Sequence, residues 1–338
     1  MYFFEWLMYD GRATTNYEEL TKEADRQIES EEKLPPIRTT QKISGRITDN
    51  LSLYAHNKTY IDARTPNDEK RGLITLIAGS IGVAFLIMLA GSSYYIGADY
   101  LSLFKGTDDQ LDTSDYLFMW IIPAIPLVSL YYYFKYVFPY LRLEAFTARR
   151  LIVRFNRITR KVYLLRPKHL GGIVALDWDA AEVCIDPNMS ELEGTGGFVM
   201  LGWDKETRSV RDADGNLKDD FEVTLVGRPT RNASELLAFW EYIRRYMEEG
   251  PEAAPKPTKL IGKFPWPWRS FMAVWRLDSR FIKTPALWVF VLVYSLLLPL
   301  IVIHAFGHWI SLLLCYEPKF PRSIEEAGVE VKAEKEIH

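Results

Sequence analysis

Hydrophobic and polar positions are distributed unevenly along the chain, and three long stretches contain no Asp, Glu, Lys or Arg. These uncharged runs cover residues 72–96, 116–134 and 284–316. A helix needs about 20 consecutive apolar residues to cross a bilayer, because the hydrocarbon core is about 30 Å thick. The first two runs therefore predict a transmembrane helical hairpin, and a buried core helix is the alternative for each of them.

The third run is longer than one membrane span and shorter than two spans joined by a turn. We expect a third transmembrane helix over about 285–303, followed by an interfacial segment that extends to Tyr316. Pro299 lies inside this helix and is expected to kink it, because proline lacks the amide hydrogen that an α-helix uses. The hydropathy pattern thus predicts three spans, a hairpin and one further helix.

Basic residues predict the side of the membrane on which each loop lies, because Lys and Arg near the span ends favour the cytoplasm. Several basic residues precede the first run and the third run, whereas the loop between the first two runs is acidic. We therefore expect a cytoplasmic N-terminus, an external acidic loop, a cytoplasmic region over 139–283 and an external C-terminal tail.

Between the second and third runs, short segments rich in β-branched and aromatic residues alternate with turn residues, which predicts strands. Residues 150–156 and 161–166 are expected to form a hairpin around residues 157–160. Further strands are expected over residues 172–176, 181–185, 197–201 and 221–226.

One amphipathic helix is predicted to close this β region over residues 233–248. Asn232 is a suitable N-cap, and Glu235 follows three residues later as in a capping box. The apolar face recurs at helical spacing and consists of Leu236, Trp240, Ile243 and Met247. Antiparallel strands followed by one such helix match a pleckstrin-homology-like (PH-like) barrel. The predicted fold class is therefore membrane-anchored α+β, with three transmembrane helices and a cytoplasmic PH-like β domain closed by a C-terminal helix.

The predicted division of the chain has six parts. They are a cytoplasmic N-terminal region (1–71), the transmembrane hairpin (72–138), the PH-like domain (139–250), a linker with an interfacial segment (251–283), the third transmembrane helix with its interfacial segment (284–316) and a polar tail (317–338). In the N-terminal region we expect short elements packed on the β domain or partial disorder. Trp and Arg side chains favour the lipid headgroups. The predicted membrane-interface residues are Trp266, Trp268, Arg269, Trp275 and Arg276.

Composition and charge exclude several classes of protein. Of the 338 residues, 48% are hydrophobic and 25% are charged, and the formal net charge is −3. This balanced charge gives no support for nucleic-acid binding. Because all the charged residues lie outside the three uncharged runs, the chain resembles neither a wholly soluble enzyme nor a many-helix transporter. The two cysteines, Cys184 and Cys315, are too few for a disulfide scaffold or a Cys-rich zinc module.

Candidate chemistry is sparse. His304 and His308 have the spacing of a two-His metal clamp, but a working site needs a third ligand, so we favour interfacial polar residues. Residues 212–216 resemble a calcium loop only faintly, because the glycine is fourth instead of sixth, and a hairpin turn is favoured. The sequence predicts no catalytic residue, no metal and no cofactor, and thus a protein that is not an enzyme.

The most distinctive motif lies within residues 147–179. It consists of Arg154, Phe155, Asn156, Arg157, Thr159, Lys161, Val162 and Tyr163, with Trp178 and Asp179 downstream. This pattern resembles an uncharacterised family of bacterial inner-membrane proteins that is associated with type VI secretion effector clusters. In physical terms the motif predicts a hairpin with two groups of residues. The packing residues would be Phe155, Val162 and Tyr163, and the turn would be set by Arg154, Asn156 and Arg157.

The resemblance implies a multi-pass protein of the bacterial inner membrane that acts as an immunity protein. Its partners would be a cognate type VI secreted toxin, which it binds and neutralises, and membrane lipids. We expect toxin contacts from the irregular loops between residues 194 and 220, with Trp203, Asp204 and Asp219 as candidates, although Trp203 could instead be core. The alternatives are an inner-membrane adaptor, a lipid- or partner-binding scaffold, and an accessory factor for effector secretion.

Overall fold

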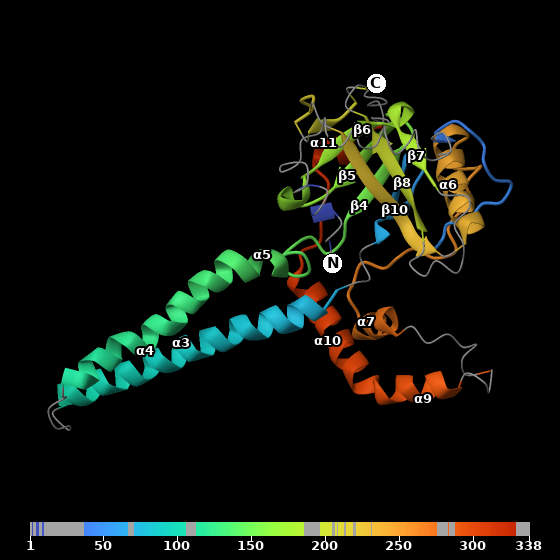
Figure 1. Cartoon of the computed structure of the whole chain (residues 1–338). Coiled ribbons are helices and arrows are strands. Elements are labelled where there is room, and N and C mark those ends of the chain that lie inside the picture. Colours follow the sequence, from blue (N-terminus) through green and yellow to red (C-terminus); the bar gives the residue numbers. More distant parts are fainter. Residues whose placement is uncertain are drawn as a thin grey trace, which may run out of the picture. The chain divides into compact units, whose positions relative to one another are not determined.

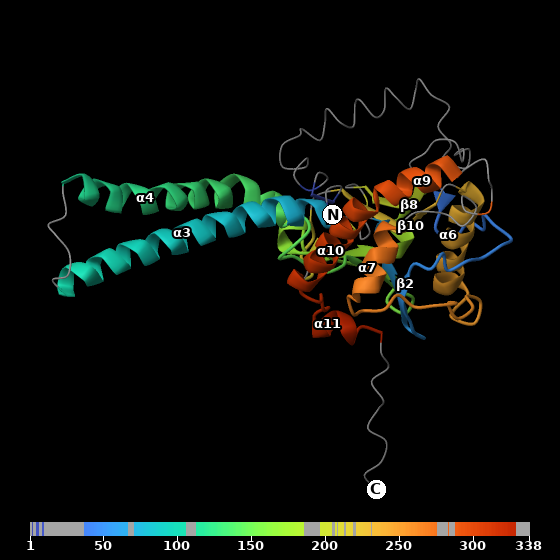
Figure 2. The same cartoon turned by 90° about the horizontal axis from the view of Figure 1, so that it is seen from below.

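Figures 1 and 2 show the computed structural model of the chain. The structure describes residues 2, 5–6, 9, 37–66, 71–105, 113–185, 197–204, 207, 209–212, 214–218, 221–230, 232–275, 283 and 288–328. The fold is α+β, as predicted, with helices and two β sheets.

The chain folds into two compact units, and each is built from segments that are distant in sequence. The helical unit consists of Met1, Lys70–Thr147 and Pro265–Cys315. The β unit consists of Tyr2–Glu69, Ala148–Phe264 and Tyr316–His338. The β unit therefore combines three segments that the sequence analysis assigned to separate regions.

The helical unit contains the predicted hairpin. Helices α3 (Leu73–Lys105) and α4 (Thr113–Tyr132) lie side by side in both views (Figures 1 and 2). A π-helical turn, Tyr133–Val137, joins α4 to α5 (Phe138–Leu141). Two stretches, Leu73–Ala98 and Phe118–Leu141, are long and apolar enough to cross a membrane, and only 17% of the most apolar window of each is buried. The core helix of a soluble protein is mostly buried, so these two stretches differ from it in their exposure.

The two hairpin helices approach each other closely where a glycine faces an aromatic ring. The Tyr133 hydroxyl donates a hydrogen bond of 2.9 Å to the Ala78 carbonyl oxygen of α3. A Cβ atom at Gly82 would lie 2.8 Å from the same ring, so this position needs a residue without a side chain. The hairpin is thus held by one buried hydrogen bond and by small residues on α3, a common means of packing apolar helices.

The predicted third transmembrane helix is not found as one continuous helix in the described part of the chain. Within the described part of the chain two helices qualify as spans by length and composition, and the third apolar run is not among them. This run instead forms α9 (Trp288–Leu296) and α10 (Leu298–Leu314), which meet at a bend (Figure 1). Pro299 accounts for the break, because proline lacks the amide hydrogen of a helix and its ring crowds the carbonyl four residues earlier. A short helix, α7 (Pro267–Val274), precedes them.

The β unit is built from two antiparallel sheets. The six-stranded sheet has the order β2–β3–β4–β5–β6–β9, and the four-stranded sheet has the order β1–β7–β8–β10. The strands are β1 (Ile37–Arg38), β2 (Leu53–His56), β3 (Tyr60–Arg64), β4 (Ile152–Asn156), β5 (Lys161–Leu165), β6 (Val174–Asp177), β7 (Glu182–Cys184), β8 (Gly197–Trp203), β9 (Arg211–Asp212) and β10 (Glu222–Thr230). The predicted hairpin is confirmed as β4 and β5.

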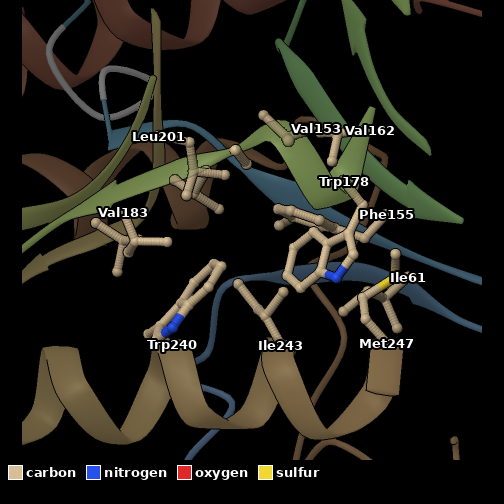
Figure 3. Packing of buried hydrophobic residues seen from close by; sticks show 14 of the residues in the cluster. Ile61, Val153, Phe155, Val162, Trp178, Val183, Leu201, Trp240, Ile243 and Met247 are labelled. Carbon is tan, nitrogen blue, oxygen red and sulfur yellow. The ribbon is translucent and has the colours of Figure 1, made fainter. Parts of the chain in front are cut away.

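The predicted closing helix is confirmed as α6 (Ala233–Glu248). The Asn232 side chain caps it by accepting a 2.9 Å hydrogen bond from the Ser234 amide. Figure 3 shows Trp240, Ile243 and Met247 of α6 pointing towards the strands. The indole of Trp240 stacks on that of Trp178, with ring centroids 5.4 Å apart. The two sheets and α6 therefore share one apolar core.

The helical hairpin is an insertion between two neighbouring strands. β3 and β4 pair along their whole length, from Tyr60 opposite Asn156 to Arg64 opposite Ile152. Residues 70–147, which lie between these strands in sequence, belong to the helical unit. Strands β1 to β3 also show that residues 37–64 of the predicted N-terminal region are part of the β sheets.

After α10 the chain returns to the β unit, and the external side predicted for the tail stays a prediction. Tyr316 bridges Ala148, and a short helix, α11 (Arg322–Glu325), follows. Phe320 and Ile324 are buried in a small apolar cluster on the six-stranded sheet, whose other members are Tyr54, Ile152, Tyr163 and Leu165. Residues 316–328 therefore belong to the same compact unit as the strands.

Candidate functional site

The motif of residues 154–163 is a hairpin whose turn is set by Asn156. The Asn156 Oδ1 atom accepts hydrogen bonds from the amides of Ile158 (3.0 Å) and Thr159 (3.1 Å). Its Nδ2 atom donates to the Ala327 carbonyl oxygen at 2.7 Å. Asn156 is fully buried, so it both closes the turn, as predicted, and attaches the C-terminal segment.

Arg154 has a different role from the one predicted. It does not set the turn, because its guanidinium binds Asp62 of β3 through Nε–Oδ1 (2.7 Å) and Nη2–Oδ2 (2.9 Å). Both residues are buried. The guanidinium carbon also lies 3.7 Å from the centre of the Tyr60 ring and 4.0 Å from that of Phe320. A bidentate ion pair between aromatic rings fixes three segments of the β unit.

The downstream Trp-Asp pair belongs to a second polar network. Arg160, in a left-handed conformation with φ 50°, binds both Asp179 and Glu248. The Trp178 indole nitrogen donates to Glu248 at 2.6 Å. The hydrogen bonds from Arg160 lower the pKa of Asp179. This network joins the β4–β5 turn, the segment after β6 and the end of α6. Its role is therefore structural.

The predicted contact residue Trp203 is corrected by the structure. Its side chain is 1% exposed, and its indole nitrogen donates to the Asp177 carbonyl oxygen at 2.8 Å. A residue buried in this way is not available to a partner. Asp204, directly after β8, is exposed, whereas Asp219 lies outside the described residues.

The side chains that β8 does expose alternate with its buried ones. Val199, Leu201 and Trp203 point into the core, whereas Phe198 and Met200 are on the other face, each 36% exposed. Met200 pairs with Cys184 of β7 and with Leu225 of β10. Leu225 is buried, so we name the surface formed by Cys184, Phe198 and Met200 the β8 outer face. The period of two in GFVMLGW is the signal that could have found it.

The predicted membrane-interface residues surround α7. Trp266 and Trp268 are 58% and 68% exposed, and Arg269 is exposed as well. Trp275 stacks on Phe271, with ring centroids 5.5 Å apart, and contacts Tyr294 of α9 edge-on at 5.3 Å. Arg276 lies outside the described residues. The interfacial role of these residues stays a prediction.

A buried carboxylate, which the sequence analysis did not single out, organises the helical unit. Glu144 is 2% exposed. Its Oε2 atom accepts hydrogen bonds from the amides of Gly72 (2.9 Å) and Thr75 (3.0 Å) and from the Thr75 hydroxyl (3.1 Å). The negative charge therefore lies at the positive end of the α3 dipole and satisfies amides that the helix leaves without partners.

The same residue holds the end of α10. The Glu144 carbonyl oxygen accepts hydrogen bonds from the Ser311 hydroxyl (2.7 Å) and the Cys315 thiol (3.1 Å). His304 Nε2 lies 3.0 Å from the Arg71 carbonyl oxygen, and His308 is buried. The described residues contain no group of three metal-ligating side chains. The two histidines thus line a helix contact.

Two glycines allow α10 to cross the start of α3. Gly72 has a φ of 112°, a conformation that favours glycine. A Cβ atom at Gly307 would lie 2.6 Å from the Gly72 carbonyl oxygen and would also overlap Leu76. Glu144, Gly72 and Gly307 together make what we name the α3 base, the junction of α3, α10 and the segment after α5.

Comparison with known proteins gives one match. A family model described as "Family of unknown function (DUF6708)" matches residues 130–332. This range begins within α4 and includes the motif hairpin, α6, α7, α9, α10 and the C-terminal segment. The chain matches no curated protein and no solved structure.

Proposed function

The chain belongs to this family of unknown function, and from that premise we propose that it is a membrane-anchored immunity protein that binds and neutralises a cognate type VI secreted toxin. Membrane anchoring is supported by one observation: two exposed apolar helices are inserted between the paired strands β3 and β4. The toxin as partner comes from the resemblance of the 147–179 motif to inner-membrane proteins of type VI effector clusters.

The exposed side chains of α3 and α4 support a lipid environment. Ile87 and Leu101 on α3 and Trp120 and Ile125 on α4 are among those more than half exposed. Apolar surface costs about 25 cal/mol per Å² in water, and soluble monomers seldom expose continuous apolar patches of more than a few hundred Å². We therefore place the hairpin in the bacterial inner membrane and, from the Lys and Arg pattern, the β unit in the cytoplasm.

The arrangement of charges supports a binding role over a chemical one. Arg154 is occupied by Asp62, Arg166 by Glu222, and Arg160 by Asp179 and Glu248. These pairs join separate segments of the β unit, so these arginines are engaged in structural contacts. The PH-like interpretation of the β unit belongs to this proposal, and the two sheets and the single helix α6 around one core support it.

We propose the β8 outer face and the adjacent Asp204 as the toxin contact. Interfaces are dominated by a few apolar anchors surrounded by weaker polar contacts. Phe198 and Met200 are partly exposed apolar side chains on a rigid strand, and Asp204 follows at the end of that strand. The proposed contact therefore stays within the region predicted from sequence, but Phe198 and Met200 take the place of the buried Trp203.

The test is a competition assay in which the toxin-producing parent strain attacks a strain that lacks this gene. We expect the deletion strain to be killed and to be protected again when the gene is restored. Survival of the deletion strain at the level of the wild type would refute the immunity role.

Two substitutions locate the contact. Met200→Glu places a charge on the β8 outer face, whereas Leu217→Glu places the same charge at a side chain that is 46% exposed elsewhere in the β unit. With equal protein levels, we expect the first variant to lose protection and the second to keep it. Equal protection by both would exclude the β8 outer face.

The attacking capacity of the deletion strain separates the alternatives. An accessory factor for effector secretion predicts that the strain can no longer kill its competitors, although it survives attack. An adaptor or scaffold predicts normal attack and normal survival. The immunity role alone predicts sensitivity with undiminished attack.

A further inference from the structure

We infer that α7, α9 and α10 form a re-entrant membrane segment, which lies in the lipid leaflet nearest the β unit and does not cross the bilayer. The partner of this apolar surface is therefore the acyl and headgroup region of one leaflet. The inference rests on the membrane location of α3 and α4 proposed above, and it is independent of the toxin.

The first step concerns the two ends of the segment. The segments Ala148–Phe264 and Tyr316–His338, which flank it, belong to the same compact unit. On the C-terminal side the attachment is extensive, because Arg150 pairs with Glu317 and Asn156 binds the Ala327 carbonyl oxygen. A compact unit lies on one side of a membrane. The chain between its segments therefore crosses the membrane an even number of times, or never.

The second step concerns length. Two crossings need about 40 apolar residues, and the uncharged run 284–316 is shorter than this. With a rise of about 1.5 Å per residue, the nine residues of α9 extend about 14 Å and the 17 residues of α10 about 25 Å. Neither helix matches a hydrocarbon core of about 30 Å. Because the number of crossings is even and two are excluded by length, the segment does not cross the membrane.

The third step concerns the exposed surface. On α9, Leu292 and Leu296 are 64% and 73% exposed, and on α10 Leu300 is 62% exposed. Trp266 and Trp268 of α7 are similarly exposed, and tryptophan favours the level of the lipid headgroups. Helices that carry leucine outward next to tryptophan and arginine fit the boundary between headgroups and acyl chains.

The fourth step concerns the position of the segment relative to the start of α3. The buried half of α10 packs on the α3 base through Gly307 and Ser311, which is the end at which α3 begins. The Trp309 indole nitrogen donates to the Pro265 carbonyl oxygen at 3.0 Å, which ties α7 to α10. Trp275, at the end of α7, contacts Tyr294 of α9. All three helices are thus connected to the point where α3 would enter the bilayer.

The experiment is cysteine labelling of the full-length protein in intact cells with a membrane-impermeant maleimide. The background is Cys184→Ser with Cys315→Ser, because serine keeps a donor for the Glu144 carbonyl oxygen. Ser323→Cys, at an exposed position of α11, reports on the C-terminal segment, and Thr113→Cys reports on the start of α4. We expect Thr113→Cys to be labelled in intact cells and Ser323→Cys only after permeabilisation.

A nitroxide at Leu296→Cys then tests contact with lipid in vesicles of phosphatidylethanolamine and phosphatidylglycerol. We expect fast relaxation by oxygen, which partitions into lipid, and little by a water-soluble nickel complex. Labelling of Ser323→Cys in intact cells would show a full crossing, and strong relaxation of Leu296 by nickel would show a segment in water. Either result overturns the re-entrant segment. A Thr113→Cys that is never labelled from outside would instead refute the membrane location of the hairpin.

Discussion

The two units of the molecule place their polar and apolar groups in opposite ways. In the β unit, Trp178, Trp203 and Trp240 are at most 1% exposed, and charged groups such as Arg154 and Asp62 are buried as pairs. In the helical unit, Trp120, Trp268 and Trp288 are 75%, 68% and 60% exposed, whereas the charged Glu144 is buried. The same residue types are therefore buried in one unit and exposed in the other.

This difference shows that hydrophobic content alone does not identify a core. In the β unit apolar residues face inward, and their burial stabilises it. In the helical unit apolar residues face outward, and the interior contacts are made by glycines and hydrogen bonds at the α3 base. The following substitutions test that contrast.

The largest effect is expected for Trp240→Ala in the β unit. The substitution leaves a cavity beside Trp178, and removal of a fully buried tryptophan costs about 3–5 kcal/mol of the free energy of unfolding. Denaturant unfolding of the full-length protein in detergent, followed by the β-sheet signal in circular dichroism, measures it. Trp268→Ala, at an exposed position of the helical unit, is the matched control and should leave that unfolding free energy unchanged. An equal loss in both variants would remove the contrast between the units.

The second effect concerns the buried ion pair. Arg154→Met leaves the Asp62 carboxylate buried without its bidentate partner, which we expect to cost about 3 kcal/mol of the unfolding free energy. The variant that combines Arg154→Met with Asp62→Leu should regain most of this loss, because neither charge of the pair is then buried. The unfolding free energies of the four proteins in the cycle give the coupling. Additive losses would show that Arg154 acts through packing on Phe320 alone.

The third effect belongs to the helical unit. Gly307→Ala places a methyl group against the Gly72 backbone, and such overpacking costs about 1–3 kcal/mol. We expect a lower temperature for loss of helix signal in detergent and faster proteolysis between α9 and α10. Gly79→Ala is the control, because a Cβ atom there meets open space. Equal behaviour of the two variants would mean that α10 does not cross α3 at this glycine.

The smallest effect is a pH dependence in the Arg160 network. Because Arg160 lowers the pKa of Asp179 in the folded state, this carboxylate contributes stability above its unfolded pKa, near 3.8, and the contribution disappears as the pH falls through the folded value. Asp179 is largely exposed, so Asp179→Asn should cost less than about 1 kcal/mol at neutral pH. The stability difference between the wild type and this variant should decrease as the pH falls below 3.8. A difference that grows in acid would contradict the assigned direction.

The elements that could be predicted from sequence are those with local determinants. The β4–β5 hairpin depends on Asn156 and the four residues after it, and α6 depends on its cap and an apolar face repeated at helical spacing. The two hairpin helices follow from hydropathy over a continuous stretch. In each case the residues that determine the structure lie within one element.

The features that were missed depend on contacts between distant residues. Arg154 finds Asp62 at a separation of 92 residues, and no local pattern marks this pair. The third apolar run looked like a span because hydropathy cannot reveal that residues 316–328 return to the strands. Trp203 is a different case, since the alternation of β8 places it on the same face as Val199 and Leu201. Because Trp203 lies close to glycines and polar residues typical of loops, the regular strand that contains it was not predicted to extend so far.

The insertion between β3 and β4 has a consequence for how the protein is made. During synthesis β3 leaves the ribosome first, and its buried residues Ile61 and Ala63 wait for a partner strand that follows only after the whole apolar hairpin. Translation is slow compared with hairpin formation, so α3 and α4 are synthesised before the sheet can be completed. The last step is the arrival of Phe320 and Ile324, which cover the outer side of that sheet. A chain interrupted before β4 would therefore present both an uncovered strand edge and an apolar hairpin to cellular proteases.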